Sequence, residues 1–182
     1  LENQSIKADS IELNIPNKYQ RSDFNKINLD LIPDGYRVYR CQDYGPATKI
    51  LPTLERYSGT DTLIIYCDDD RIYHKYWLSR LVNAYKNNLG HCVFEEGSSL
   101  EFHMQGMKKN LAYRLKRIIS LSLWKPKNNY DKVSIVKGFG GVLVTPQMFD
   151  HTISKIPTEF FFVDDIWLSA NLQKLGISFK WT

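Results

Sequence analysis

Three consecutive aspartates, Asp68, Asp69 and Asp70, follow directly after the apolar run TLIIYC at residues 62–67. Adjacent carboxylates repel one another unless a cation or hydrogen-bond donors offset their charge. Mg²⁺ and Mn²⁺ prefer oxygen ligands of this kind and often share them with phosphates. In an extended segment, residues i and i+2 point to the same side, so Asp68 and Asp70 could face one site while Asp69 faces another. A simpler interpretation stays open: solvated loop acids, one of which caps the next helix.

A second acidic pair, Asp164 and Asp165, follows the apolar run FFV at the start of an expected helix. A carboxylate in this position can be directed into a cleft and act as a general base. Alternatively, Asp164 only caps the helix, because the helix dipole favours acidic residues in the first turn. Both interpretations are consistent with the pattern.

Two glycine-containing turns could approach a ligand closely. In DYGPATK (43–49), the Gly45–Pro46 turn leads into an expected helix whose first turn carries Lys49, so its backbone donors could hold an anion or a base edge. In KGFGGVL (137–143), the glycines permit close contact between the backbone and a ligand. Each turn is also consistent with an ordinary connection between elements.

Strand-like and helix-like segments alternate along the chain and would position these residues. Apolar runs predict strands at 11–15, 36–41, 62–67, 92–95, 141–145 and 177–181. Helical patterns cover 47–57, 74–88, 109–121 and 165–175, the last ended by Gly176. This alternation predicts an α/β fold with a mostly parallel central sheet flanked by helices, in which ligands bind beyond the carboxyl ends of the strands. We expect a single domain over residues 1–182.

Composition narrows the function classes. No apolar run reaches the roughly 18–20 residues of a membrane span, and no signal peptide is evident, so a cytoplasmic protein is expected. Cys41, Cys67 and Cys92 lack CxxC spacing, which argues against a zinc or redox motif. Between residues 103 and 137, nine Lys or Arg stand against one acid. This basic, less regular insertion, at about 97–137, predicts a local anionic partner, such as an acidic acceptor or a peripheral membrane surface. A solvated basic helix is the plainer alternative.

Taken together, these segments resemble a GT-A-fold glycosyltransferase of the family-2-like kind. The resemblance rests on TLIIYCDDDRIYHKYWLSRLV (62–82), on GFGGVLVTPQMF (138–149) followed by FVDDIWLSANLQKLGI (162–177), and on DYGPATKILPTLE (43–55). It covers about residues 5–180 and is weakest from 97 to 130. It implies a single nucleotide-diphospho-sugar transferase domain with a Rossmann-like sheet.

The resemblance also implies roles for individual residues. The nucleotide-sugar site would comprise Asp43, Gly45, Pro46, Lys49, Asp68, Asp69, Gly140 and Gly141. Asp70 would ligate the divalent ion, Mn²⁺ or Mg²⁺. Asp165, or alternatively Asp164, would be the catalytic base, and Trp167 would help to wall the acceptor cleft. The expected donor is a UDP-sugar, and the expected acceptor is a glycan, a lipid-linked group or a protein. Transfer with inversion is expected, and a nucleic-acid partner is not.

Two features depart from the family pattern. Such domains normally begin with a strand that forms the floor of the nucleotide site, whereas Leu1–Ser5 resembles the end of the helix that follows it. Two explanations stay open: the first strand is missing from this sequence, or the fold itself is trimmed. In addition, no histidine follows Asp165, so water or phosphate would have to complete the metal shell.

Two other function classes stay open. A metal-dependent phosphoryl-transfer or hydrolase domain would use the two acidic groups to hold two ions, although DDDRI does not match the DxDx[TV] pattern of one such family. A catalytically inactive nucleotide- or carbohydrate-binding module would bind the same ligands without turnover, and an activity test would distinguish it.

Overall fold

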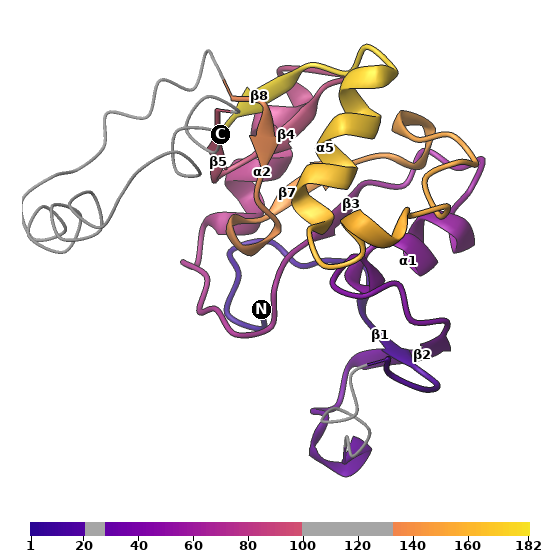
Figure 1. The fold of residues 1–182 in the computed structure, drawn as a ribbon. Helices are drawn as coiled ribbons and strands as arrows, with labels where there is room; N and C mark the ends of the chain where they lie inside the picture. Colours follow the sequence, from indigo (N-terminus) through magenta and orange to yellow (C-terminus); the bar gives the residue numbers. More distant parts are fainter. Residues whose placement is uncertain (21–27, 100–132) are drawn as a thin grey trace, which may run out of the picture.

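A computed structural model of the chain describes residues 1–20, 28–99 and 133–182. Within these residues the strands are β1 (Ile11–Pro16), β2 (Tyr36–Cys41), β3 (Ile64–Tyr66), β4 (Cys92–Phe94), β5 (Gly97–Ser98), β6 (Ile135–Val136), β7 (Val142–Val144) and β8 (Phe179–Trp181). The α-helices are α1 (Leu51–Arg56), α2 (Trp77–Lys86) and α5 (Asp164–Lys174) (Figure 1). Single 3₁₀ turns lie at Leu29–Leu31, Ala47–Lys49, Gly138–Gly140, Pro146–Met148 and Thr158–Phe160. The expected α/β composition is confirmed.

The central sheet has the strand order β3–β7–β4–β8. β7 is antiparallel to both of its neighbours, whereas β4 and β8 are parallel. Val142, the first residue of β7, pairs with Tyr66 and Phe94, the last residues of β3 and β4. The chain therefore enters β7 where β3 and β4 end, and β7 has to run back against them.

The expectation of a mostly parallel central sheet is thus wrong for the pairings around β7, and the sheet is mixed. An apolar run such as GVLVT shows that a strand forms but carries no information on its direction. β3, β4 and β8 nevertheless point the same way, so their carboxyl ends lie on one side of the sheet.

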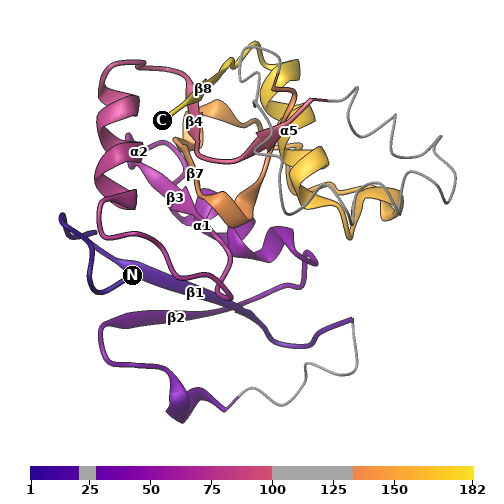
Figure 2. The same cartoon turned by 90° about the vertical axis from the view of Figure 1, so that its left-hand side faces the viewer.

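Helices cover both faces of this sheet, because alternate strand residues point to opposite faces. On one face, Trp77, Leu78 and Leu81 of α2 pack with Val93 and Leu143. On the other, buried residues of α1 and α5 join the alternate strand residues in a larger core: Leu51, Leu54, Leu168, Leu172, Ile64, Tyr66, Cys92, Phe94, Val142 and Val144. Figure 2 shows α2 and α5 on opposite sides of the sheet.

The ends of α5 follow from its sequence. Gly176, with φ of 75°, ends the helix as expected. The N–H of Ile177 donates to the Leu172 carbonyl at 2.9 Å and that of Gly176 to the Gln173 carbonyl at 3.0 Å, which is a Schellman motif. At the other end Val163 is the N-cap and makes no side-chain capping bond. Asp164 is therefore the first helical residue and not the cap.

The helix expected at 47–57 is divided into the 3₁₀ turn Ala47–Lys49 and α1. Pro52 has no backbone N–H to bond to the preceding turn, so a continuous α-helix cannot form across it. The helix expected at 74–88 is shorter at both ends: residues 75–76 form a turn before α2, and α2 ends at Lys86.

The first residues of the chain form turns and not the end of a helix, so that expectation is wrong. They are held against α2, where the Gln4 Oε1 accepts a hydrogen bond from the Leu78 N–H at 2.9 Å and the Gln4 Nε2 donates to the His74 carbonyl at 3.1 Å. A buried glutamine from elsewhere in the chain thus caps α2, and its side-chain bonds fix the first residues of the chain against that helix.

β1 and β2 form a separate parallel ribbon, with Ile11 opposite Tyr36. In the described residues no strand pairs with the outer edge of β3, which leaves the expectation of a missing first strand untested. The ribbon is attached to α1 through Arg56, whose guanidinium bonds Glu12 at 2.5 Å and Asn14 at 2.9 Å.

The two ends of the basic insertion lie side by side, because β5 at its start pairs antiparallel with β6 at its end. The helix expected at 109–121 lies outside the described residues. Among the helices that are described, none combines the length and apolar character needed to cross a bilayer.

Candidate active site

An ion-pair cluster lies at the carboxyl end of β3. The Lys49 Nζ is 2.6 Å from the Asp68 Oδ1 and 3.0 Å from the Asp164 Oδ2. The three residues come from the turn before α1, from the segment after β3 and from the start of α5. Asp165 is adjacent, and we refer to these four residues as the Lys49 cluster. The structure therefore brings together residues from three of the segments in which the sequence predicts chemistry.

The local backbone explains why Lys49 reaches this position. Gly45 has φ of 61°, a conformation that favours glycine, and a Cβ there would collide with the Phe161 carbonyl just before α5. The turn can therefore lie against the segment that leads to Asp164. A Cβ on Gly138 would lie 2.6 Å from the Lys49 Nζ, so a second glycine makes room for the ammonium.

The charge on Lys49 is maintained by its neighbours. Burial acts to lower the pKa of Lys49, but the carboxylates of Asp164 and Asp68 outweigh it and raise the pKa above its usual value. Lys49 is thus a permanent cation in the cluster, and it offsets one of the three negative charges around it.

Asp165 differs from Asp164 in its partners. Its Oδ1 accepts a hydrogen bond of 2.9 Å from the Gly138 N–H, and it makes no ion pair within the described residues. Burial raises the pKa of Asp165, with the Gly138 N–H opposing that shift and the neighbouring Asp164 adding to it. A carboxylate with a raised pKa that is not neutralised by a cation is the better general base. The geometry therefore favours Asp165 over Asp164 for that role.

Two tyrosines support the cluster. The Tyr73 hydroxyl lies 3.1 Å from the Asp68 carbonyl and 2.9 Å from the Phe139 carbonyl, and it joins the loop after β3 to the GFGG turn (Gly138–Gly141). Tyr66 is buried at 3% exposure, and its hydroxyl has no hydrogen-bond partner in the described residues. Burial raises the pKa of Tyr66 well above its usual value, so it stays a neutral phenol beside the carboxylates.

The Gly45–Pro46 turn uses its own polar groups. The Asp43 carboxylate accepts bonds from the N–H groups of Gly45 at 2.8 Å and Gln20 at 2.7 Å. The Thr48 N–H donates to the Gly45 carbonyl at 3.0 Å, and the Lys49 N–H to that of Pro46 at 3.4 Å. Asp43, Gly45 and Pro46 thus shape the turn that places Lys49, and the amides named here are already bonded within the chain.

The GFGG turn is packed against protein. A Cβ on Gly140 would lie 2.5 Å from the Glu96 Cβ, and a Cβ on Gly141 would collide with the Trp77 indole. The Trp77 Nε1 donates to the Gly140 carbonyl at 2.8 Å. Both glycines permit close packing with α2 and the segment after β4, which is a structural reason for their presence.

Asp69 and Asp70 are exposed and lie outside the ion pairs of the described residues. In the part of the chain that the structure describes, no three His, Cys, Asp or Glu side chains gather closely enough to hold a metal ion. Asp68, the other end of the expected DxD motif, is paired with Lys49. The described side chains do not form a ready ligand set for Mn²⁺ or Mg²⁺.

Trp167 faces away from Asp165. Two residues along a helix turn by roughly 200°, so the two side chains project in nearly opposite directions. The Trp167 Nε1 donates to the Ile153 carbonyl at 2.8 Å, and its ring lies 5.9 Å from that of Phe160. Trp167 therefore fastens the segment before α5 to the helix and does not wall a cleft at Asp165.

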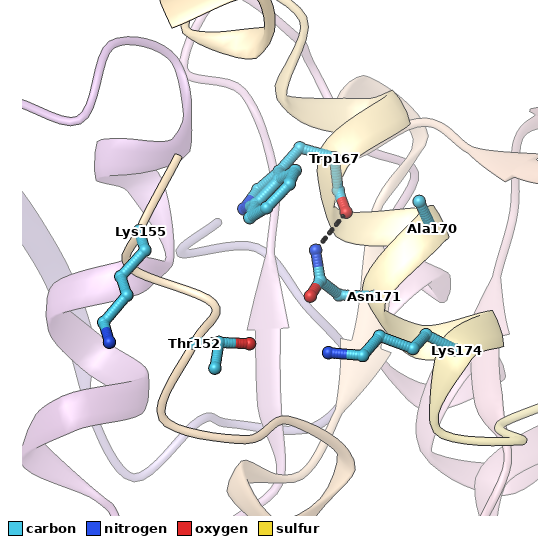
Figure 3. A pocket seen from close by; sticks show the side chains of 6 residues that line it. All are labelled: Thr152, Lys155, Trp167, Ala170, Asn171 and Lys174. Atoms are coloured by element: carbon cyan, nitrogen blue, oxygen red, sulfur yellow. Dashed lines mark hydrogen bonds between the residues drawn. The ribbon is translucent and has the colours of Figure 1, made fainter. Parts of the chain in front are cut away.

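A hollow of about 250 Å³ lies beside this tryptophan, between α5 and the loop before it (Figure 3). Its lining consists of Thr152, Lys155, Trp167, Ala170, Asn171 and Lys174. The Asn171 amide donates to the Trp167 carbonyl at 2.9 Å. Because none of the Lys49 cluster lines it, this hollow is separate from the candidate site.

Four residues at or beside the site were not predicted from the sequence: Tyr66, Tyr73, Phe139 and Arg71. Arg71 directly follows the three aspartates, and Phe139 lies inside the glycine turn, so their proximity to predicted site residues was a usable signal. Tyr66 gave no such signal, because an aromatic residue in a strand is ordinarily core.

Comparison of the chain with protein-family models, curated proteins and solved structures found no match.

Proposed function

We propose that this chain transfers a glycosyl group from a nucleotide-diphosphate sugar, with a UDP-sugar as the expected donor, to an acceptor hydroxyl. One observation carries the proposal: Asp68, Lys49 and the Asp164–Asp165 pair converge beside the carboxyl end of β3. Open α/β sheets bind their ligands at such ends. The resemblance in sequence to GT-A-fold glycosyltransferases gives the reaction class, and the GT-A fold is part of the same proposal.

The proposed reaction needs a base and a leaving group. Asp165 accepts the proton of the acceptor hydroxyl, whose oxygen forms a bond to the anomeric carbon. The bond from that carbon to the phosphate oxygen breaks, and the diphosphate leaves with the electron pair. Lys49 holds Asp68 and Asp164 in place, and the Gly138 N–H orients Asp165. A single base opposite the leaving group gives inversion at the anomeric carbon.

The expected Mn²⁺ or Mg²⁺ is a separate question, because Lys49 already occupies the position between Asp68 and Asp164. Asp70 would be the one protein ligand, with water and phosphate completing the shell. The described residues do not fit a metal site formed in advance, so no step of the proposed reaction is assigned to an ion.

Thermal unfolding with nucleotides is the first test. A ligand that binds only the folded state raises the melting temperature. UDP, GDP and dTDP are each added with and without Mn²⁺, and UDP is expected to give the largest rise. Asp70→Ala tests the ion: loss of any extra rise due to Mn²⁺ would support Asp70 as its ligand. No shift with any nucleotide would contradict the proposal.

Turnover separates an enzyme from a binding module. Release of UDP from a UDP-sugar is measured for the wild type, for Asp165→Asn and for Asp34→Asn, an exposed acid that serves as the control. We expect Asp165→Asn to lose about 10²–10⁴-fold in rate, the usual contribution of a general base, and the control to keep its rate. Nucleotide binding without turnover in the wild type would favour the inactive module.

A further inference from the structure

Two cationic side chains share one aromatic ring at the GFGG turn. The Arg71 guanidinium carbon lies 4.4 Å from the centroid of the Phe139 ring, and the Lys137 Nζ lies 5.7 Å from it. Both distances are within the range of a cation–π contact, which holds a cation without neutralising it. In the described residues neither Arg71 nor Lys137 forms an ion pair with a carboxylate. We call Arg71 and Lys137 the cation pair.

The cation pair is attached to the Lys49 cluster by backbone contacts. Lys137 directly precedes Gly138, whose N–H bonds Asp165. Phe139 accepts a hydrogen bond from the Tyr73 hydroxyl at its carbonyl, and the same hydroxyl contacts the carbonyl of Asp68. The backbone that carries the Phe139 ring is therefore held beside the candidate base and the segment after β3.

Among the described residues, Lys49 and the glycine N–H groups of the GFGG turn are further donors beside this site, and they are already engaged. Lys49 is paired with two carboxylates. In the GFGG turn, the N–H of Gly138 bonds Asp165, that of Gly140 bonds the Lys137 carbonyl at 3.1 Å, and that of Gly141 bonds the Gly138 carbonyl at 2.9 Å. These glycine amides cannot also hold a phosphate in this conformation.

An anionic ligand at the Lys49 cluster needs additional positive charge, because the cluster has three carboxylates and one ammonium. Arginine binds phosphate oxygens through a planar set of donors, and lysine binds them as a point charge. The cation pair supplies both kinds of group around one aromatic ring. It is also partly accessible, since Arg71 is exposed and Lys137 half-buried.

We propose that Arg71 and Lys137, positioned by the Phe139 ring, bind the diphosphate of the donor and stabilise it as it leaves. This inference rests on the proposed function and adds to it the groups that recognise the leaving group. The Arg71 and Lys137 side chains, and not the glycine amides, then stabilise the negative charge that develops on the phosphate oxygens.

Binding of UDP and of inorganic pyrophosphate to the full chain tests the inference by isothermal titration calorimetry. The variants are Arg71→Ala, Lys137→Ala and the double variant. The matched control is Lys75→Ala, since the Lys75 ammonium also lies over an aromatic ring, 4.8 Å from the Tyr76 centroid. We expect each single variant to bind both ligands about tenfold more weakly. The double variant should be weaker still, and the control should bind as the wild type does.

Melting temperatures without ligand, expected to be unchanged, show that the variants fold. Arg71→Lys keeps the charge and loses the planar donor set, so it should bind more tightly than Arg71→Ala and more weakly than the wild type.

The outcomes separate this inference from the proposed function. If the wild type binds UDP and the double variant binds it equally well, the inference is overturned and the proposed function stands. If pyrophosphate binds through Arg71 and Lys137 but no nucleotide binds, the inference is supported and the proposed function fails. If neither ligand binds the wild type, both fail.

Discussion

Lys49 and Asp68, nineteen residues apart in the sequence, form a hydrogen-bonded ion pair in which Nζ lies 2.6 Å from Oδ1. The same ammonium lies 3.0 Å from the Asp164 Oδ2, so one cation joins the segment after β3 to the start of α5. The positive charge of Lys49 is thus paired with carboxylates of the protein itself. This arrangement separates the two residues of the acidic pair, because Asp164 is neutralised by Lys49 while Asp165 is held by a backbone N–H.

Replacing this cation should destabilise the fold. Lys49→Met keeps the length of the side chain but leaves two carboxylates without their partner. Removing one partner of a buried ion pair costs about 3–5 kcal/mol, and we expect the low end, about 3 kcal/mol, because the Asp68 side chain is 35% exposed. Urea unfolding measures the change, with the exposed Lys75→Met as the control. Equal stability of Lys49→Met and the wild type would show that the pair adds nothing to folding.

Asp165 should make stability depend on pH. Its pKa in the folded protein is raised, mainly by burial, above its value in the unfolded chain. Between these two pKa values the folded state binds more protons than the unfolded state, so stability falls as the pH rises through that window, which begins near pH 4. Asp165→Asn should remove this fall, and Asp34→Asn should keep it. Chemical unfolding at a series of pH values from about 3 to about 7 gives the comparison.

The pH dependence of turnover should have the opposite sign. If Asp165 is the base, its carboxyl must be ionised, so the rate should rise as the pH passes its raised pKa. A rate that is flat across that window would argue against Asp165 as the base. Together the two profiles distinguish a catalytic carboxylate from one that only affects stability.

Much of the fold could be predicted, since apolar runs and helix signals report on burial and local conformation. All six expected strands are present, and α5 is displaced from its expected range by one residue at each end. The meeting of Asp68 with the Asp164–Asp165 pair also follows from a general rule on where sheets bind ligands. The direction of β7 could not be predicted, because it depends on where the preceding turn enters the sheet.

Partner choice within the site was less predictable. Whether Lys49 meets Asp164 or Asp165 depends on contacts among three separate segments, and no local pattern encodes it. For the same reason, the glycines at 140 and 141 suggested room for a ligand, whereas Glu96 and Trp77 fill that room. A pattern shows that a Cβ is absent but not what occupies the space.

Gly141 offers a direct test of that packing. Gly141→Ala places a methyl group in the Trp77 ring at φ of 97°. The strained φ should cost about 1 kcal/mol and the overpacking a further 1–3 kcal/mol or so. Gly59→Ala is the matched control, because Gly59 has φ of 77° with nothing within 4 Å of its Cβ position. Equal losses in urea unfolding for the two variants would mean that the contact with Trp77 is not restrictive.

The attachment of the β1–β2 ribbon should depend on Arg56. Its guanidinium bonds Glu12 and Asn14 of β1 and lies 3.8 Å from the centroid of the Tyr39 ring in β2. Arg56→Ala removes these contacts together, and we expect faster hydrogen exchange in β1 and β2 with little change in α2. The control is Arg80→Ala, which breaks the Arg80–Glu95 pair at the opposite face of the sheet. If Arg56→Ala leaves exchange in the ribbon as slow as in the wild type, then Arg56 is not needed to hold it, and the Asn14–Thr53 and Tyr57–Glu12 bonds together with the pairing of β1 and β2 suffice. A local effect is expected because the ribbon lies outside the central sheet, and units with few buried contacts open independently of the core.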